Sequence, residues 1–172
     1  MNRFRPAIAV GFALLCGACG YRVSGHADAL PKNIKTIAIP AFGNATTLYR
    51  LPERLPADIA REFISRTRYA VVTDPNKADA VMSGSVIKVY SGAATLDPTV
   101  GRATSAQMTV TLFISLTDRA TGKVIYSRNF EARERYEVST DTRAYFEETD
   151  SALDRLSREV ARDTVSAILE KF

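Results

Sequence analysis

The chain has 172 residues, of which 24% are charged, and its formal net charge is +4 at pH 7. This length suits one domain with a sizeable core and is too short for two comfortable ones. The small net charge does not favour a nucleic-acid partner, because the phosphate backbone is bound by concentrated Lys and Arg. The single histidine, His26, has no Cys or acid cluster at ligand spacing, so the composition predicts no metal site and no cofactor.

Residues 1–18 have the organisation of a secretory signal peptide. Arg3 and Arg5 give a positive start, and residues 7–15 form an uncharged apolar run that is too short to span a bilayer. Gly-Ala at 17–18 then precedes Cys19, which resembles a bacterial lipoprotein box, although the pattern usually has Leu where this chain has Cys16. The resemblance implies cleavage before Cys19 and acylation of its sulfur and amino group with fatty acids such as palmitate. The alternative is an ordinary signal peptide, or an uncleaved anchor, with an incidental cysteine.

Cleavage at this position predicts the organisation of the mature chain. Its net charge would be +2, because two arginines leave with the signal, and no disulfide could form, because Cys16 leaves too. Residues 19–33 are polar and interrupted by Gly and Pro, so we expect a lipidated N-terminus and tether. Residues 34–172 form the predicted single domain. Gly20 rather than Asp follows the cysteine, which by the usual sorting pattern favours the outer membrane.

The domain opens with a predicted strand and helix. Residues 34–40 contain alternating Ile and predict a strand with one apolar row, and residues 42–44 predict a turn. Residues 51–68 change to a helical period, with an apolar stripe at Leu55, Ile59 and Phe63. Either Pro52 or Pro56 could open this helix, because proline is tolerated in the first turn.

Two strands follow the helix. Residues 69–72 predict a short strand that ends in a turn, and residues 78–90 predict a long one. Gly84 inside the long strand indicates a bulge or close packing. Residues 91–101 are expected to form a loop.

The clearest pattern is a long hairpin. From residue 107 to residue 117, apolar residues at even positions alternate with mostly hydroxyl-bearing residues, which predicts a half-buried strand. Residues 118–123 make the turn, with Gly122 available for a positive φ. On the returning strand we expect one face to carry Val124, Tyr126, Phe130 and Tyr136, and the opposite face to carry Ser127, Asn129, Glu131, Arg133 and Arg135.

Residues 141–171 are helical again, with a stripe of Leu153, Leu156, Val160, Thr164, Ala167 and Ile168. Such a helix is on the order of 45 Å long and matches the length of the hairpin. The element order therefore predicts an α+β fold, a mixed and largely antiparallel sheet with two helices packed on one face. A coiled coil is the alternative for the last stripe, but the sheet needs a cover.

The sequence gives little support for catalysis. It contains no Gly-rich phosphate loop, no nucleophile with a plausible His partner and no paired carboxylates at a spacing that indicates a shared cleft. We therefore predict that the protein is not an enzyme.

The order of several short motifs resembles the LptE family of lipopolysaccharide-assembly lipoproteins across nearly all the mature chain. These motifs are Cys-Gly-Tyr-Arg-Val at 19–23, Leu-Pro at 30–31, Ile-Lys-Thr-Ile-Ala-Ile-Pro at 34–40, Phe-Gly-Asn-Ala-Thr at 42–46, Ile-Ala-Arg-Glu-Phe at 59–63 and Ala-Asp-Ala at 78–80. The resemblance implies an outer-membrane lipoprotein lodged inside the β-barrel LptD that assists delivery of lipopolysaccharide. The alternative is a periplasmic lipoprotein that activates a cell-wall enzyme or assembles a secretion system, since such proteins share the motifs within 34–90.

Two sets of residues are predicted to contact these partners. The first set consists of cations expected to meet lipopolysaccharide phosphates, Lys88, Arg102, Arg133 and Arg135. The second set lies on the hydroxyl-rich face and is expected to contact the barrel wall, Thr109, Thr111, Phe113 and Asn129. Solubilising charges and the ordinary preference of Thr for exposed strands are the plain alternatives.

Overall fold

The computed structural model describes residues 30–171, so Cys19 and the rest of residues 1–29 lie outside the described part of the chain. The first elements are β1 (Thr36–Ala38), β2 (Gly43–Asn44), α2 (Arg50–Arg66) and β3 (Ala70–Val72). A short 3-10 helix, η2 (Pro75–Lys77), leads to three long strands, β4 (Ala80–Leu96), β5 (Ala103–Asp118) and β6 (Val124–Glu137). The last element is α3 (Thr142–Glu170).

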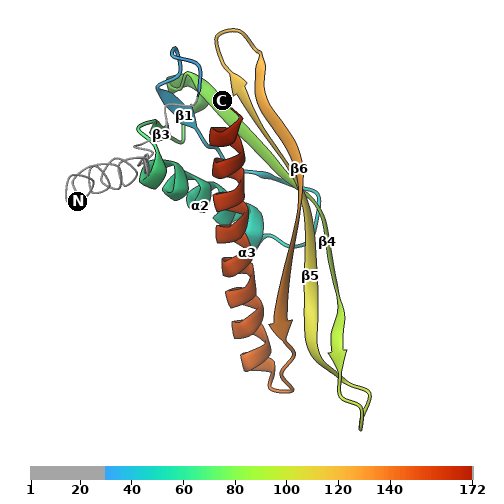
Figure 1. Cartoon of the computed structure of the whole chain (residues 1–172). Coiled ribbons are helices and arrows are strands. Elements are labelled where there is room, and N and C mark those ends of the chain that lie inside the picture. The colour runs from blue at the N-terminus through green and yellow to red at the C-terminus, as the bar shows by residue number, and fades with distance from the viewer. Residues whose placement is uncertain (1–29, 172) are drawn as a thin grey trace, which may run out of the picture.

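The strands form one mixed sheet in the order β3-β1-β4-β5-β6, and β2 also pairs with β4. β1 runs parallel to β3 and β4, and β2 runs parallel to β4, whereas β5 is antiparallel to both β4 and β6. Both helices lie on the same face of the sheet, and α3 runs along the long strands (Figure 1). The predicted α+β fold is therefore confirmed.

The alternating pattern of β5 produces a sharply two-sided strand. Its even positions are at most 3% exposed and form the floor of the core: Met108, Val110, Leu112, Ile114 and Leu116. The turn to β6 contains Gly122 at a φ of 68°, and the Asp118 side chain accepts a hydrogen bond from the Thr121 amide at 2.9 Å. The predicted hairpin and its turn are confirmed.

The two helices cover this floor with the stripes expected from their periods. Asp141 caps α3 by accepting from the Ala144 amide at 2.8 Å, and its 29 residues extend about 44 Å. Leu55, Ile59 and Phe63 of α2 are fully buried. This helix begins at Arg50, so Pro52 stands in its first turn, where an amide has no intrahelical acceptor, and Pro56 lies inside it.

The structure corrects the predicted face of Val124, which is 54% exposed and does not share a face with Tyr126. The register shifts between Leu116 and Thr117, so Tyr126 pairs with Leu116 but Val124 pairs with Thr117. Ile125 is the extra residue of this bulge and is buried. A bulge breaks strict alternation, which is why the sequence pattern misplaced Val124.

Two boundaries also differ from the prediction. Residues 91–96 belong to β4 rather than to a loop, because pairing with β5 continues from Ser91 to Leu96. Gly43 and Asn44 form β2 beside Ser85 and Val86 rather than only a turn. Small residues carry weak strand signals, and in both segments the neighbouring strand supplies the backbone hydrogen bonds.

The start of the described chain also packs more closely than a tether would. Leu30 is 5% exposed, and its amide donates to the Tyr69 hydroxyl at 2.9 Å. The Asn33 side chain donates to Asp118 at 3.0 Å. In β1, Ile37 and Ala38 are both fully buried, so this strand is covered on both faces rather than having one apolar row.

Candidate functional site

The candidate site is the face of β4, β5 and β6 opposite the helices, which we call the open face. Its residues lie in cross-strand rows fixed by the register of the three strands. From the β5–β6 turn outward, the first row is Val81–Thr117–Val124. The rows that follow are Ser83–Ser115–Ser127, Ser85–Phe113–Asn129, Lys88–Thr111–Glu131, Tyr90–Thr109–Arg133 and Gly92–Gln107–Arg135.

The second and third rows from the turn carry no charge, and we call them the uncharged half. Four of their side chains are serines and one is Asn129. Phe113, which is 37% exposed, is the one large apolar side chain among these six residues. Short hydroxyls and an amide can donate and accept hydrogen bonds without an ionic group that must be desolvated.

The next three rows, which we call the charged half, place cations beside hydroxyls and an aromatic ring. Lys88 stands opposite Thr111, Arg133 opposite Thr109, and Arg135 opposite Gln107. All three cations are exposed. Arg133 forms an ion pair with Glu131 at 2.5 Å, whereas Lys88 and Arg135 have no ion pair among residues 30–171. The charged half therefore carries three cations and one acid.

A bulge in β4 determines that Lys88 belongs to this face. Up to Val86 the even residues of β4 face the helices, and Val86 pairs with Leu112. The register then shifts, so that Lys88 pairs with Thr111 and Ile87 is the extra residue, 47% exposed. Strict alternation would have placed the Lys88 ammonium over the buried core. The bulge places it in water instead.

Arg102 lies apart from the other three cations, in the loop between β4 and β5. Asp97 shapes this loop by accepting from the amides of Thr99 at 2.7 Å and Val100 at 3.2 Å, and these bonds lower the pKa of the Asp97 carboxyl. Gly101 adopts a φ of 65°. Arg102 is five residues from Gln107, or about 17 Å along the strand. Val100, in the same loop, is 68% exposed.

The structure thus brings together only part of each predicted set. Lys88, Arg133 and Arg135 share the charged half, and Arg102 does not. Phe113 and Asn129 are neighbours in the uncharged half, whereas Thr109 and Thr111 stand between charged side chains. The sequence analysis missed Tyr90, which is 63% exposed beside Thr109. Tyr90 lies two residues after Lys88, and side chains two apart in a strand share a face, so this spacing could have identified it.

Metal-binding clusters and membrane-spanning helices are both absent from the described residues. Among residues 30–171, no group of three or more His, Cys, Asp or Glu is placed to hold a metal ion. In the same residues, no helix is long and apolar enough to cross a membrane. The open face can therefore supply hydrogen bonds and positive charge, the interactions that bind a polar wall or an anionic group.

Comparison with known protein families gives a match. The family model of LptE, described as lipopolysaccharide-assembly, matches residues 34–168. No curated protein matches the chain.

Three solved structures share the fold at low sequence identity. A Caulobacter crescentus protein described as a lipoprotein is 14% identical, covers 76% of this chain and 88% of its own, and has a TM-score of 0.55. PelC from Paraburkholderia phytofirmans, solved as a dodecamer, is 16% identical with a TM-score of 0.52, covering 83% and 93%. Lipoprotein B from Nitrosomonas europaea is 15% identical with a TM-score of 0.50, covering 83% and 94%.

Proposed function

The chain belongs to the LptE family of lipopolysaccharide assembly, and from this premise we propose that it is an outer-membrane lipoprotein that plugs the β-barrel LptD. In this proposal it assists the assembly of lipopolysaccharide at the outer membrane. The family is a non-enzymatic assembly family of cell-envelope lipoproteins. The match over residues 34–168 is the observation that carries the proposal, and the open face supports it.

The anchor of the proposed lipoprotein is Cys19. Acylation of its sulfur and amino group would give several acyl chains, which hold a protein on a membrane where a single chain is only marginal. Mass spectrometry of protein recovered from membranes should find the mature chain beginning at an acylated Cys19. An unmodified Cys19, or fractionation with the inner membrane, would contradict this part of the proposal.

The uncharged half of the open face is the proposed contact with the barrel. The lumen of a membrane barrel is polar because its apolar side chains face lipid. Asn129 and the serines around Phe113 can pair with such a wall without leaving a desolvated charge. Thr109 and Thr111 would extend the contact toward the charged half.

The charged half is the proposed contact with lipopolysaccharide. Guanidinium groups bind phosphates through paired hydrogen bonds, and an ammonium binds them as a point charge. Arg135 and Lys88 are free of ion pairs within the described residues, and Arg133 shares its charge with Glu131. Arg102 would contact phosphates independently, from the loop at the far end of β4.

The alternative of a cell-wall or secretion lipoprotein differs in the partner, because its fold would be the same. Photo-crosslinkers at Phe113 and Asn129 should capture lumen-facing residues of a copurifying barrel. The matched control is a crosslinker at Arg158, which is exposed on the outer side of α3. Capture by the α3 probe alone would show the opposite orientation, and copurification with a soluble cell-wall enzyme would favour the alternative.

A further inference from the structure

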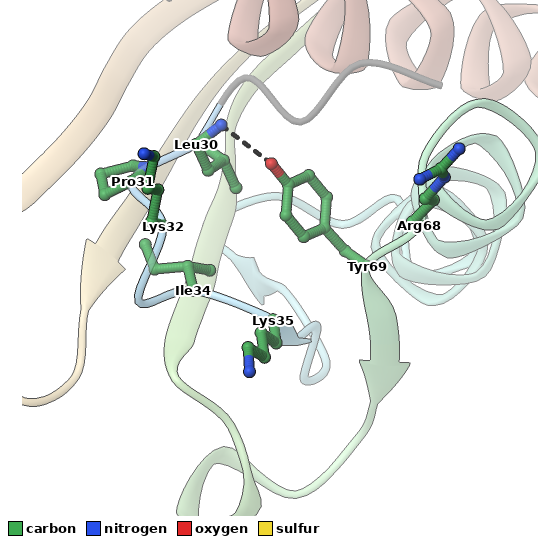
Figure 2. Close-up of a pocket in the computed structure, with 7 residues that line it drawn as sticks. All are labelled: Leu30, Pro31, Lys32, Ile34, Lys35, Arg68 and Tyr69. Carbon is green, nitrogen blue, oxygen red and sulfur yellow. Dashed lines mark hydrogen bonds between the residues drawn. The ribbon is translucent and has the colours of Figure 1, made fainter. Parts of the chain in front are cut away.

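A second surface lies at the end of the sheet where the described chain begins, far from the charged half. A pocket of about 570 Å³ opens there, lined by Leu30, Pro31, Lys32, Ile34, Lys35, Arg68 and Tyr69. Leu30, Ile34 and Tyr69 are buried and form its apolar part. Figure 2 shows Lys32, Lys35 and Arg68 around this apolar group.

Four cations at this end are not held in close ion pairs within the described part of the chain. Lys32, Lys35, Arg68 and Lys123 are all exposed and take part in no ion pair among residues 30–171. Asp79 accepts from the Lys35 and Thr36 amides at 2.9 and 3.0 Å.

Asp118, the other acid at this end, accepts from the Asn33 side chain and the Thr121 amide. Both carboxylates keep their negative charge, and the Lys35 ammonium interacts with Asp79 at longer range. Four exposed cations nevertheless outnumber these two acids, so a net positive charge faces solvent or an external anion.

An apolar extension of the same surface lies on the other side of Pro31. Pro31, Val124 and Ile125 line an adjoining cavity of about 260 Å³ together with Asp118, Lys123 and Lys171. Val124 is 54% exposed there because of the bulge at Ile125. The surface thus combines apolar groups with a basic rim, as surfaces that lie against anionic lipid do.

The position of the lipid anchor at Cys19 indicates which kind of molecule binds in this pocket. Leu30 is 11 residues from Cys19, so the chain between them spans at most about 40 Å whatever its conformation. The strand β5 alone extends about 53 Å away from this end. The pocket therefore lies within about 40 Å of an acylated Cys19, whereas the far loop can lie beyond that reach.

We propose that this end of the domain binds an anionic phospholipid of the membrane that holds the Cys19 acyl chains. The phosphate contacts Lys32, Lys35 and Arg68, and the apolar part of the lipid covers Leu30, Ile34 and Tyr69. The inference rests on the lipid anchor of the proposed function. It adds a second lipid contact, at the opposite end of the sheet from Arg102.

The test uses the mature acylated protein in nanodiscs of phosphatidylcholine alone or with about one third phosphatidylglycerol. A photoactivatable benzoylphenylalanine replaces Pro31 in one variant, Val124 in a second and Val100, in the far loop, in a third. We expect lipid cross-links from the first two positions, about fivefold more in the anionic discs, and none from Val100. About 0.5 M NaCl should remove the dependence on anionic lipid.

Charge variants identify the residues responsible. The triple change Lys32→Gln, Lys35→Gln and Arg68→Gln should reduce the yield in anionic discs to that in phosphatidylcholine. The matched control, Arg143→Gln, Arg158→Gln and Arg162→Gln, removes three exposed cations of α3 and should leave the yield unchanged. All six positions are exposed, and unchanged circular dichroism confirms that the variants fold.

The outcomes that overturn the inference are distinct from failure of the anchor. Two results would show that the tether alone brings this end close to lipid. One is an equal cross-link yield in the two kinds of disc. The other is an undiminished yield from the Lys32, Lys35 and Arg68 triple variant. Loss of the anionic dependence on addition of inorganic phosphate in place of salt would assign the site to free phosphate. Protein that stays outside the discs would contradict acylation of Cys19 itself, and this inference with it.

Discussion

Gly84 of β4 lies directly against the ring of Phe42, so close that a β-carbon at residue 84 would collide with three ring atoms. The sequence left open whether Gly84 marks a bulge or close packing, and the structure shows close packing.

We predict that Gly84→Ala lowers the free energy of unfolding by about 1–3 kcal/mol, because the buried Phe42 must shift. Urea denaturation measures this change. Gly92→Ala is the control, since a β-carbon there meets only the end of the flexible Tyr90 side chain. Equal losses in the two variants would contradict the packing explanation.

Adjacent residues of β5 should respond to truncation in opposite ways. Leu112 is 1% exposed in the core, so Leu112→Ala should cost about 2–5 kcal/mol through lost burial and a residual cavity. Thr111 faces the open side, and Thr111→Ala should change stability by less than about 1 kcal/mol. Thermal or urea unfolding of the purified variants compares them, and a costly Thr111→Ala would show that the open face is covered by something within the chain.

An ion-pair network joins the two helices and makes a pH-dependent contribution to stability. Asp150 of α3 accepts from Arg54 Nη2 at 2.8 Å through both carboxylate oxygens and also from Arg50 of α2. Arg54 chiefly, then Arg50, hold the pKa of Asp150 below its ordinary value of 3.8. Since the folded pKa is the lower one, the contribution is complete above the unfolded pKa and is lost as pH falls through the folded value.

Asp150→Asn should therefore cost about 0.5–1 kcal/mol at pH 7, because the carboxylate is partly exposed and screened. The difference from the unmodified protein should shrink as the pH is lowered below about 3.9. Urea unfolding at both pH values measures it. Glu147→Gln, which removes an exposed ion pair within α3, should cost less than about 0.5 kcal/mol, and a pH-independent Asp150→Asn effect would argue against the network.

Neutralising the predicted lipopolysaccharide cations should weaken binding and reduce its salt dependence. The quadruple variant Lys88→Gln, Arg102→Gln, Arg133→Gln and Arg135→Gln removes the cations of the charged half and of the far loop. We expect at least about a tenfold loss of affinity at low salt. Binding of purified lipopolysaccharide at several salt concentrations measures it. Unchanged binding by a folded quadruple variant would refute the assignment.

Returning only Arg102 to the quadruple variant separates the two locations. Because Arg102 lies about 17 Å along the strand from Arg135, its contribution should add independently to that of the other three. Full recovery by Arg102 alone would place the contact in the loop rather than on the charged half.

The elements with long, regular periods could be predicted from the amino-acid pattern alone. The stripe of Leu55, Ile59 and Phe63, the even apolar positions of β5 and the stripe of α3 lie in the core as predicted, except that Ala167 of α3 is only partly buried. These patterns are reliable because each face of a helix or strand is either buried or solvated along its whole length. The family resemblance likewise followed from motif order, and the family match confirms it.

Only the tertiary structure decided which side chains share the open face. The bulges at Ile87 and Ile125 each add one residue. They place Lys88 and Val124 on the open face, whereas strict alternation would place them on the face that the helices cover. A bulge is stabilised by the fit of a strand to its neighbour and leaves little mark on local sequence. The pocket beside Leu30 likewise joins residues near positions 30 and 69, which only pairing of β1 with β3 brings together.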